Sequence, residues 1–278
     1  MGALGLWAYL GDGLEFRLPD LVRQIANPPN VPVDADFRPR SCFLQLGQRA
    51  ASFKNCEDGN DPGKPTLFLW GDSHAAHLYP GYKKIFSPHY NLIQRTMAAC
   101  PPVLGFSWYL SPHCPEANAG LLAEIARRRP DRLVISGDWL AYGLDKKMDL
   151  VENTLREVQK IGLARVELIG PDPYWIGGLP KRLYEAYLSD PLHRIPERLP
   201  AGIDDRRRNQ DSVLAELARR YGMEYASPLQ ILCNEEGCLT RVGDGSNSLT
   251  TWDPEHFSAA GSEYVVERFP SAQELRGK

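Results

Sequence analysis

The 278-residue sequence contains no long hydrophobic run and no excess of basic charge. Its longest N-terminal apolar stretch, residues 3–10, is far shorter than the roughly 20 residues that a membrane-spanning helix needs. That stretch also lacks the basic start and small-residue cleavage site of a secretory signal peptide. With a formal net charge of −3, the chain offers no broad basic surface for phosphates, so we expect no nucleic-acid partner.

Cysteine pairs with the Cys-x-x-Cys spacing of zinc sites are also absent, and we therefore expect no metal site. The chain nevertheless has six cysteines, whose order along the sequence suggests three local disulfides: Cys42–Cys56, Cys100–Cys114 and Cys233–Cys238. The sequence leaves other pairings open, including six free thiols in a cytosolic protein. Disulfides indicate an oxidising compartment. Because no export signal is present, we expect this chain to be part of a longer protein that carries it across a membrane.

From residue 66 onward, short apolar runs alternate with amphipathic stretches. The runs predict strands at 66–70, 91–93, 132–136, 165–169 and 223–226. The amphipathic stretches predict helices at 116–129, 150–161 and 205–221, and a last helix that Ser258 caps and that continues to residue 268. Strands that alternate with helices indicate a parallel sheet covered on both faces, which is the three-layer α/β/α sandwich of α/β proteins.

Two segments fall outside this alternation. Residues 1–40, with dense prolines at 28–32, are predicted to be an N-terminal extension, and 41–278 a single domain. Residues 171–200 are rich in proline, glycine and aromatic residues, and we expect them to form a long surface loop. Loops of that length in a compact domain are usually functional or mobile.

A serine follows the first strong strand in the sequence Gly71-Asp72-Ser73-His74. Ligands of open parallel sheets gather at the carboxyl ends of the strands, so Ser73 would face a cleft. If a helix starts just after it, the backbone N–H groups there could hold an oxyanion. The alternative is structural, since such tripeptides occur in many turns and Asp-Ser is a good helix cap.

A serine hydroxyl is a poor nucleophile at neutral pH and needs a base. Asp253 and His256 stand three positions apart just before the last predicted helix, a spacing that lets the carboxylate reach the histidine Nδ1. We therefore predict that Ser73 is a nucleophile, His256 its base and Asp253 the group that orients His256. His74 is the alternative base by proximity alone. The structural alternative is a helix-entry loop in which Asp253 is a capping acid and His256 is present by chance.

These residues resemble the motifs of a known family, the SGNH (GDSL-like) hydrolase superfamily. Gly71-Asp72-Ser73 matches its first block and Asp253-x-x-His256 its last. The chain resembles more narrowly the SGNH domains fused to acyltransferase family 3 membrane domains. That resemblance rests on Cys100-Pro101-Pro102, on the Cys233/Cys238 pair, and on the ending Asp-x-x-His-x-Ser-x-x-Gly at 253–261. It covers about residues 40–270, and residues 13–19 look like the linker after the last membrane helix of that group.

The resemblance implies an O-acetyltransferase of the periplasm that acetylates a cell-surface polysaccharide such as lipopolysaccharide O-antigen. The partner would be the chain's own membrane domain, which would handle the acetyl donor, acetyl-CoA, so that no cofactor is expected in this domain. The acceptor would be the surface glycan. A carbohydrate acetylesterase that uses the same residues is the first alternative. A polysaccharide-binding module with a decayed site is the second.

The sequence departs from the family in the residues of the oxyanion hole. The third block lacks its asparagine and reads Ser136-Gly137-Asp138-Trp139, and no glycine closely follows the second strand, where residues 96–100 stand. The oxyanion donors predicted from backbone N–H groups are therefore Ser73, Ala99, Gly137 and Trp139. Tyr174 and Trp175, in the expected long loop, are the candidates for stacking on a sugar ring, although an aromatic residue is more often buried.

Overall fold

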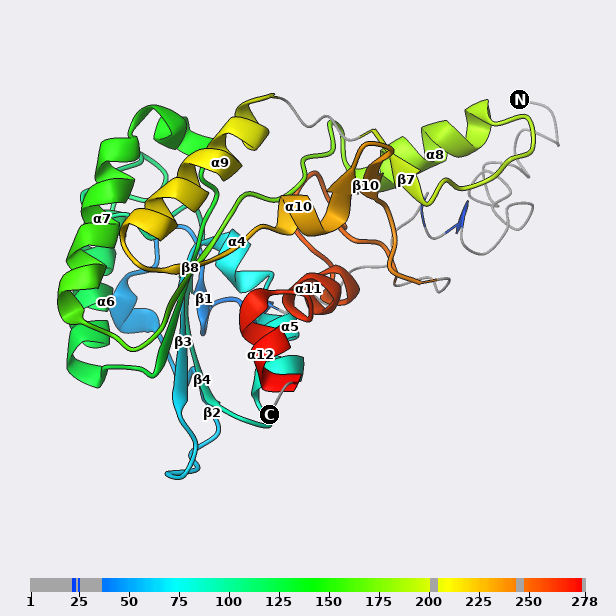
Figure 1. The fold of residues 1–278 in the computed structure, drawn as a ribbon. Coiled ribbons are helices and arrows are strands. Elements are labelled where there is room, and N and C mark those ends of the chain that lie inside the picture. Colours follow the sequence, from blue (N-terminus) through cyan, green and yellow to red (C-terminus); the bar gives the residue numbers. More distant parts are fainter. Residues whose placement is uncertain (1–21, 24, 26–36, 201–204, 244–247, 277–278) are drawn as a thin grey trace, which may run out of the picture.

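The computed structural model describes residues 22, 23, 25, 37–200, 205–243 and 248–276. A seven-stranded sheet forms the centre of this part of the chain (Figure 1). The parallel strands follow the order β1 (Phe43–Leu44), β4 (Asn91–Met97), β3 (Thr66–Gly71), β5 (Arg132–Ser136), β6 (Val166–Ile169) and β8 (Glu224–Ala226). The short β2 (Glu57–Asp58) pairs antiparallel with β4. The expected parallel sheet is present, and β3 lies between β4 and β5.

Helices pack on both faces of the sheet and complete three layers (Figure 1). One face is covered by α6 (Cys114–Arg128), α7 (Met148–Ile161) and α9 (Asp205–Arg220). The other carries α5 (Tyr79–Phe86), α10 (Pro228–Leu232), α11 (Ala259–Val266) and α12 (Pro270–Arg276). Along β3, Phe68 and Trp70 enter the first core, while Leu67 and Leu69 enter the second. A strand buried on both faces is apolar along its length, which explains the continuous apolar run.

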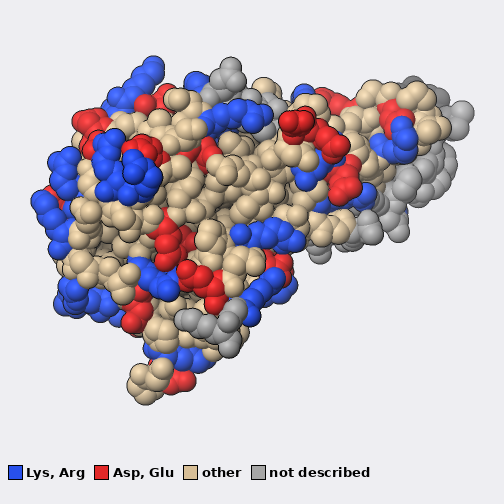
Figure 2. All heavy atoms as spheres, viewed as in Figure 1, with Lys and Arg blue, Asp and Glu red and all other residues tan. Residues whose placement is uncertain are grey.

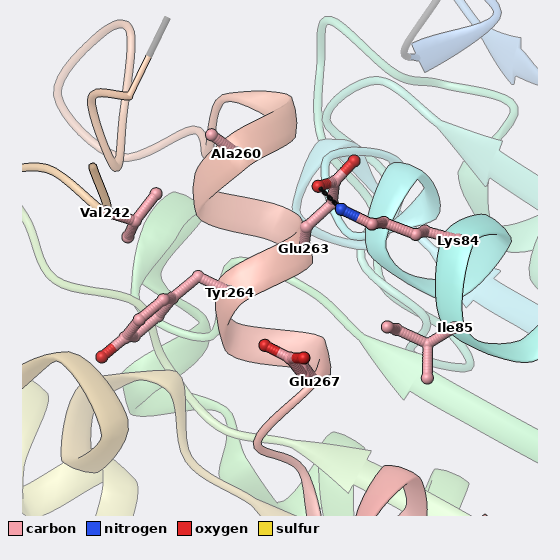
Figure 3. A pocket seen from close by; sticks show the side chains of 7 residues that line it. All are labelled: Lys84, Ile85, Val242, Ala260, Glu263, Tyr264 and Glu267. Carbon is pink, nitrogen blue, oxygen red and sulfur yellow. Dashed lines mark hydrogen bonds and ion pairs between the residues drawn. The ribbon is translucent and has the colours of Figure 1, made fainter. Parts of the chain in front are cut away.

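Helices α5 and α11 approach closely because Gly81 has no side chain. A Cβ at Gly81 would lie 2.5 Å from the carbonyl oxygen of Ser262, and the Gly81 N–H donates to the Ser262 hydroxyl over 3.0 Å. An ion pair of Lys84 with Glu263 joins the two helices beside a hollow of about 240 Å³ (Figure 3). The contact holds α11, and the segment that leads into it, against the sheet.

The expectation of a long loop at 171–200 is wrong. The segment contains α8 (Leu179–Ser189) and β7 (Arg198–Leu199), and β7 forms a small antiparallel sheet with β10 (Gly237–Leu239) and β9 (Cys233–Asn234). Trp175, Leu179 and Leu183 are buried together against this second sheet, at Cys238. The start of α8 contains Gly177, Gly178 and Pro180. These residues are typical of loops, so the short apolar repeat that follows does not predict a helix.

Most of the other predicted elements are confirmed. The strand at 132–136 coincides with β5, and α6, α7 and α9 begin and end within two residues of the predicted bounds. Ser258 caps α11, because its hydroxyl accepts the Gly261 N–H over 3.0 Å. The last predicted helix ends at Val266, and α12 follows as a separate helix. The sequence did not predict α5, α10, β1, β2 or the two short 3₁₀ helices at Ala50–Ser52 and Ala141–Lys146.

The three predicted disulfides, Cys42–Cys56, Cys100–Cys114 and Cys233–Cys238, are present, which confirms the local pairing. Most of the extension predicted at residues 1–40 lies outside the described residues. None of the helices in the described part is long and apolar enough to cross a membrane. Acidic and basic side chains are mixed over the face shown in Figure 2.

Candidate active site

The turn that carries Ser73 is defined by its neighbours on both sides. β3 ends at Gly71, where a Cβ would lie only 1.8 Å from the carbonyl oxygen of Ser136 on β5, so no larger residue fits. Asp72 then caps the short α4 (Ser73–Ala76), because its Oδ1 accepts the His74 N–H over 2.8 Å. Ser73 is therefore the first helical residue, at the carboxyl edge of the sheet, as the sequence predicts.

The structure brings Ser73, His256 and Asp253 together. Nε2 of His256 lies 2.9 Å from Oγ of Ser73, and Nδ1 lies 2.6 Å from Oδ2 of Asp253. Oδ1 of Asp253 also accepts the backbone N–H groups of Glu255 and His256 over 2.9 and 2.6 Å. Although burial opposes it, the hydrogen bonds from His256 lower the pKa of the Asp253 carboxyl. An ionised Asp253 keeps the proton of neutral His256 on Nδ1 and leaves Nε2 to accept the serine proton.

An apolar wall holds the imidazole of His256 from one side. The Trp252 ring stacks on it at 5.7 Å between centroids, and the Phe37 ring meets it edge-on at 6.1 Å. Phe37 belongs to a cluster with Phe43, Ala76, Ala98 and Trp252, which connects β1, α4 and the turn after β4. The described end of the N-terminal segment therefore contributes to the site.

A buried polar cluster also adjoins His256. The His74 ring is 5.1 Å from the His256 ring, and its Nδ1 is 2.6 Å from Oδ2 of Asp172. Burial alone would lower the pKa of His74, but Asp138, Asp172 and Asp72 raise it to about 10. We therefore regard His74 as an imidazolium locked between carboxylates, which is not available as the base for Ser73.

Asp72 links the serine turn to the exit of β5. Its Oδ1 caps α4, and its Oδ2 accepts the backbone N–H of Asp138 over 2.9 Å. Burial raises the pKa of Asp72 to about 6, although His74 and the Asp138 N–H oppose the rise. These contacts favour an orienting role for Asp72, and they leave the Asp138 N–H unavailable to an oxyanion.

The predicted oxyanion donors differ in their surroundings. The Ser73 N–H, in the first turn of α4, has no acceptor within its own helix. Ala99 follows β4 with a φ of +52°, in the left-handed region, and among the described residues its N–H makes no backbone hydrogen bond. Trp139 is buried, and its indole Nε1 donates to the Ile169 carbonyl. A Cβ at Gly137 would lie 2.7 Å from Cδ of Pro102, so that turn is tightly packed.

Two groups of side chains near Ser73 are close enough to surround a metal ion: His74, His77 and Asp172, and His74, Asp138 and Glu255. Both contain His74, which as an imidazolium has no lone pair to donate. In the first group, Nδ1 of His77 accepts the Phe257 N–H over 3.2 Å, so the proton of the neutral ring is on Nε2. A metal ion at either group would have to displace the protons that these rings carry.

The two predicted sugar-contact residues lie in different environments. Trp175 is 1% exposed in the core of the small second sheet, so it has no face for a sugar ring, and that expectation is corrected. Tyr174 is half-buried, and the guanidinium of Arg207 lies 4.9 Å from the centre of its ring.

Sequence reasoning missed His77, Asp172, Glu255 and Arg207 at this site. Asp172 follows β6 at the same sheet edge as Ser73, and the strand-end argument that selected Ser73 could have found it. Arg207 joins the cluster from α9 by donating to the Asp172 carbonyl over 2.8 Å and to Glu255 over 3.0 Å. A histidine on a short helix, such as His77, carries no signal of its own.

The chain is similar to one protein family and to several solved structures. The family description "SGNH domain (fused to AT3 domains)" matches residues 41–271. The periplasmic domain of a lipopolysaccharide acetyltransferase from Salmonella ser. Paratyphi A has a similar structure, with a TM-score of 0.76 and 25% identity; the match covers 91% of this chain and 99% of that one. Est24, a carbohydrate acetylesterase from Sinorhizobium meliloti, matches at a TM-score of 0.47 and 12% identity, over 77% of this chain and 99% of that one. No curated protein sequence matches the chain.

Proposed function

The chain belongs to the family of SGNH domains fused to AT3 domains, and from that premise we propose that it transfers an acetyl group through Ser73 to a hydroxyl of a surface glycan. The observation that carries the proposal is the hydrogen-bonded series Ser73–His256–Asp253, with distances of 2.9 and 2.6 Å. A nucleophile, a base and a group that orients the base form the arrangement that acyl transfer through serine requires.

In the proposed reaction, Oγ of Ser73 attacks the carbonyl carbon of the acetyl donor while Nε2 of His256 takes the hydroxyl proton. The donor's leaving group departs with that proton, and an acetyl–Ser73 ester remains. The acceptor hydroxyl then attacks this ester, again giving its proton to His256, which returns it to Oγ of Ser73. Asp253 stays ionised throughout and stabilises the imidazolium that forms in each step.

We assign the oxyanion hole to the backbone N–H groups of Ser73 and Ala99. The left-handed backbone of Ala99 turns the chain immediately after β4, at the sheet edge where α4 begins. Such a conformation costs a residue with a Cβ on the order of 1 kcal/mol or more, and strain of this kind gathers at functional sites. Gly137 and Trp139 remain predictions for a further donor.

The family description supports a membrane-embedded AT3 domain as the partner. We propose that this domain carries acetyl groups from acetyl-CoA across the membrane to Ser73, so that the present domain needs no cofactor. The periplasm is the proposed location, because its oxidising chemistry suits the three disulfides. A surface polysaccharide such as lipopolysaccharide O-antigen is the proposed acceptor, by likeness to the Salmonella acetyltransferase domain.

Hydrolysis of acetyl esters is the second candidate function. The side chains of His256 and Asp253 are 20% and 21% exposed, so water can reach the acyl group on Ser73. A site open to water hydrolyses its acyl-enzyme whenever no acceptor hydroxyl arrives first. We expect weak acetylesterase activity in the isolated chain for this reason.

The two functions predict opposite changes in the surface glycan. The test is to express the protein from its complete gene with Ser73→Ala and to follow O-acetyl groups on the polysaccharide by NMR. Loss of O-acetyl groups supports transfer through Ser73. Acetylation above the wild-type level identifies an esterase, and acetylation equal to the wild type removes Ser73 from the transfer path.

A further inference from the structure

A cavity of about 380 Å³ is lined in part by Glu255, the residue that directly precedes His256. It is lined from the exit of β5, from the segment after β6, from the start of α9 and from the loop that carries His256. The residues with a role in the argument below are Asp138, Tyr174, Ile176, Arg207 and Glu255. The volume is within the range of about 300–1,000 Å³ that is usual for small-molecule sites.

Two carboxylates of this cavity lie near the same nitrogen of His74 and within 4.8 Å of each other. Nε2 of His74 is 3.8 Å from Oδ2 of Asp138 and 4.0 Å from Oε1 of Glu255. These separations are longer than direct hydrogen bonds, so both oxygens keep capacity to accept a hydrogen bond from a ligand. The positive charge of the buried His74 imidazolium offsets the repulsion between the two carboxylates. The fold can therefore hold two acceptors close together at this position.

The other carboxylate oxygens are already held in place. Oδ1 of Asp138 accepts the N–H groups of Leu140 and Ala141 over 3.2 and 3.1 Å. Oε2 of Glu255 accepts from Arg207 over 3.0 Å. Each side chain is therefore fixed through one oxygen and presents the other beside His74, which is the preorganisation that a binding site needs.

Apolar surface lines the same cavity. Ile176 is 64% exposed at the cavity, and Tyr174 presents a ring whose orientation is held by the Arg207 guanidinium. A sugar ring combines hydroxyl donors along its edge with C–H groups on its faces. Carboxylate acceptors next to aromatic and aliphatic surface match both properties.

We propose that this cavity binds the acceptor sugar ring, with Asp138 and Glu255 accepting hydrogen bonds from its hydroxyls and with Tyr174 and Ile176 covering one face. The proposal rests on the proposed function, because it places the acceptor beside acetyl–Ser73. The acetyl group itself does not suit the cavity, since a methyl group gains nothing from two carboxylates. Oε1 of Glu255 lies 4.0 Å from Nε2 of His74, whose ring is 5.1 Å from the His256 ring. An acceptor held by Glu255 would therefore lie near the base that must take its proton.

Binding is measured separately from turnover. The probe is the surface polysaccharide of cells that produce the protein, freed of O-acetyl groups by mild base, and the protein is the 278-residue chain with Ser73→Ala. Saturation-transfer NMR should show contact with ring protons of the polysaccharide. Adding Tyr174→Ala or Glu255→Gln should weaken binding about tenfold or more. Adding Tyr187→Ala, a half-buried tyrosine of α8 outside the cavity, should leave it unchanged.

Equal binding by the Tyr174→Ala and Tyr187→Ala proteins would overturn the proposal, and so would the absence of any binding by the Ser73→Ala chain. Far-ultraviolet circular dichroism and thermal unfolding confirm that each variant is folded. Failure of the proposed function has a different signature. If the polysaccharide binds in this cavity but Ser73→Ala leaves its acetylation in cells intact, the subsite stands and the transferase assignment falls.

Discussion

Nδ1 of His77 accepts a hydrogen bond from the backbone N–H of Phe257, the residue that directly follows His256. His77 is fully buried, and its Nε2 lies 3.4 Å from Oδ2 of Asp172, the same oxygen that receives His74. Burial and the nearby charge of His74 hold the pKa of His77 well below its usual value, so its ring is neutral. His77 thus connects the buried cluster to the backbone that carries the base.

This relationship predicts that His77 is a positioning residue. His77→Ala should lower kcat for p-nitrophenyl acetate about fivefold, the equivalent of roughly 1 kcal/mol for one lost hydrogen bond, with little change in KM. His77→Asn should restore most of kcat, because its side-chain oxygen can accept the same N–H. Equal losses in the two variants would show that His77 acts only through packing.

Two histidines of the site should respond oppositely to truncation. His256→Ala should cut acetyl-ester turnover by a factor of about 10³ or more, because the serine loses its base. Its unfolding midpoint in urea should stay close to the wild type, since His256 is partly exposed. A variant that keeps its turnover would remove His256 from the reaction.

His74→Ala should instead lower the free energy of unfolding by about 3 kcal/mol or more, because Asp172 and Asp138 lose their buried cation. The variant should therefore unfold at a lower urea concentration than the wild type. Any loss of turnover should follow the loss of folded protein. A stable His74→Ala chain without turnover would make His74 the base and reverse the assignment.

The charge of His74 also predicts a dependence of stability on pH. Its pKa is raised to about 10 in the fold, against about 6.5 in an unfolded chain. A raised pKa contributes stability that is complete below the unfolded value and is lost as the pH rises through the folded value. The free energy of unfolding should therefore contain a term that declines from neutral pH to about pH 10. NMR of the His74 ring should show no titration near pH 6.5; a titration there would contradict the ion cluster.

Two glycines give a matched test of the serine turn. Gly71→Ala would place a Cβ 1.8 Å from the Ser136 carbonyl oxygen and 2.6 Å from Cβ of Ala75, so β3 or α4 must move. We expect a large loss of stability together with loss of turnover. Gly120→Ala, on an open face of α6, should instead stabilise the chain by roughly 0.5–1 kcal/mol. A Gly71→Ala chain as stable and active as the wild type would contradict the packing of this turn.

The sequence was informative where structure depends on nearby residues. The strand at Arg132–Ser136, the cap at Ser258 and the approach of Asp253 to His256 each depend on residues within a few positions of one another. Ser73 could be related to His256 across 183 positions only because each stands at a recognisable boundary of an element.

The features that the sequence did not predict depend on contacts between residues that are distant in the chain or that carry no distinctive local pattern. His74 and Asp172 are 98 positions apart, and their contact requires α4 and the exit of β6 to share one sheet edge. Helix α8 was missed because two glycines precede it and a proline stands in its first turn. Trp175 was misassigned because aromatic composition does not distinguish a buried ring from one that faces a ligand.

The most direct test of the account is to look for acetyl on Ser73. The 278-residue chain is mixed with p-nitrophenyl acetate, quenched in acid within the first turnovers, digested and analysed by peptide mass spectrometry, with the Ser73→Ala chain as the control. We predict that the peptide containing Ser73 gains the mass of one acetyl group, that fragmentation places it on Ser73, and that the control gains none. Release of p-nitrophenol at the same rate by both proteins, with no acetyl on Ser73, would contradict the central claim.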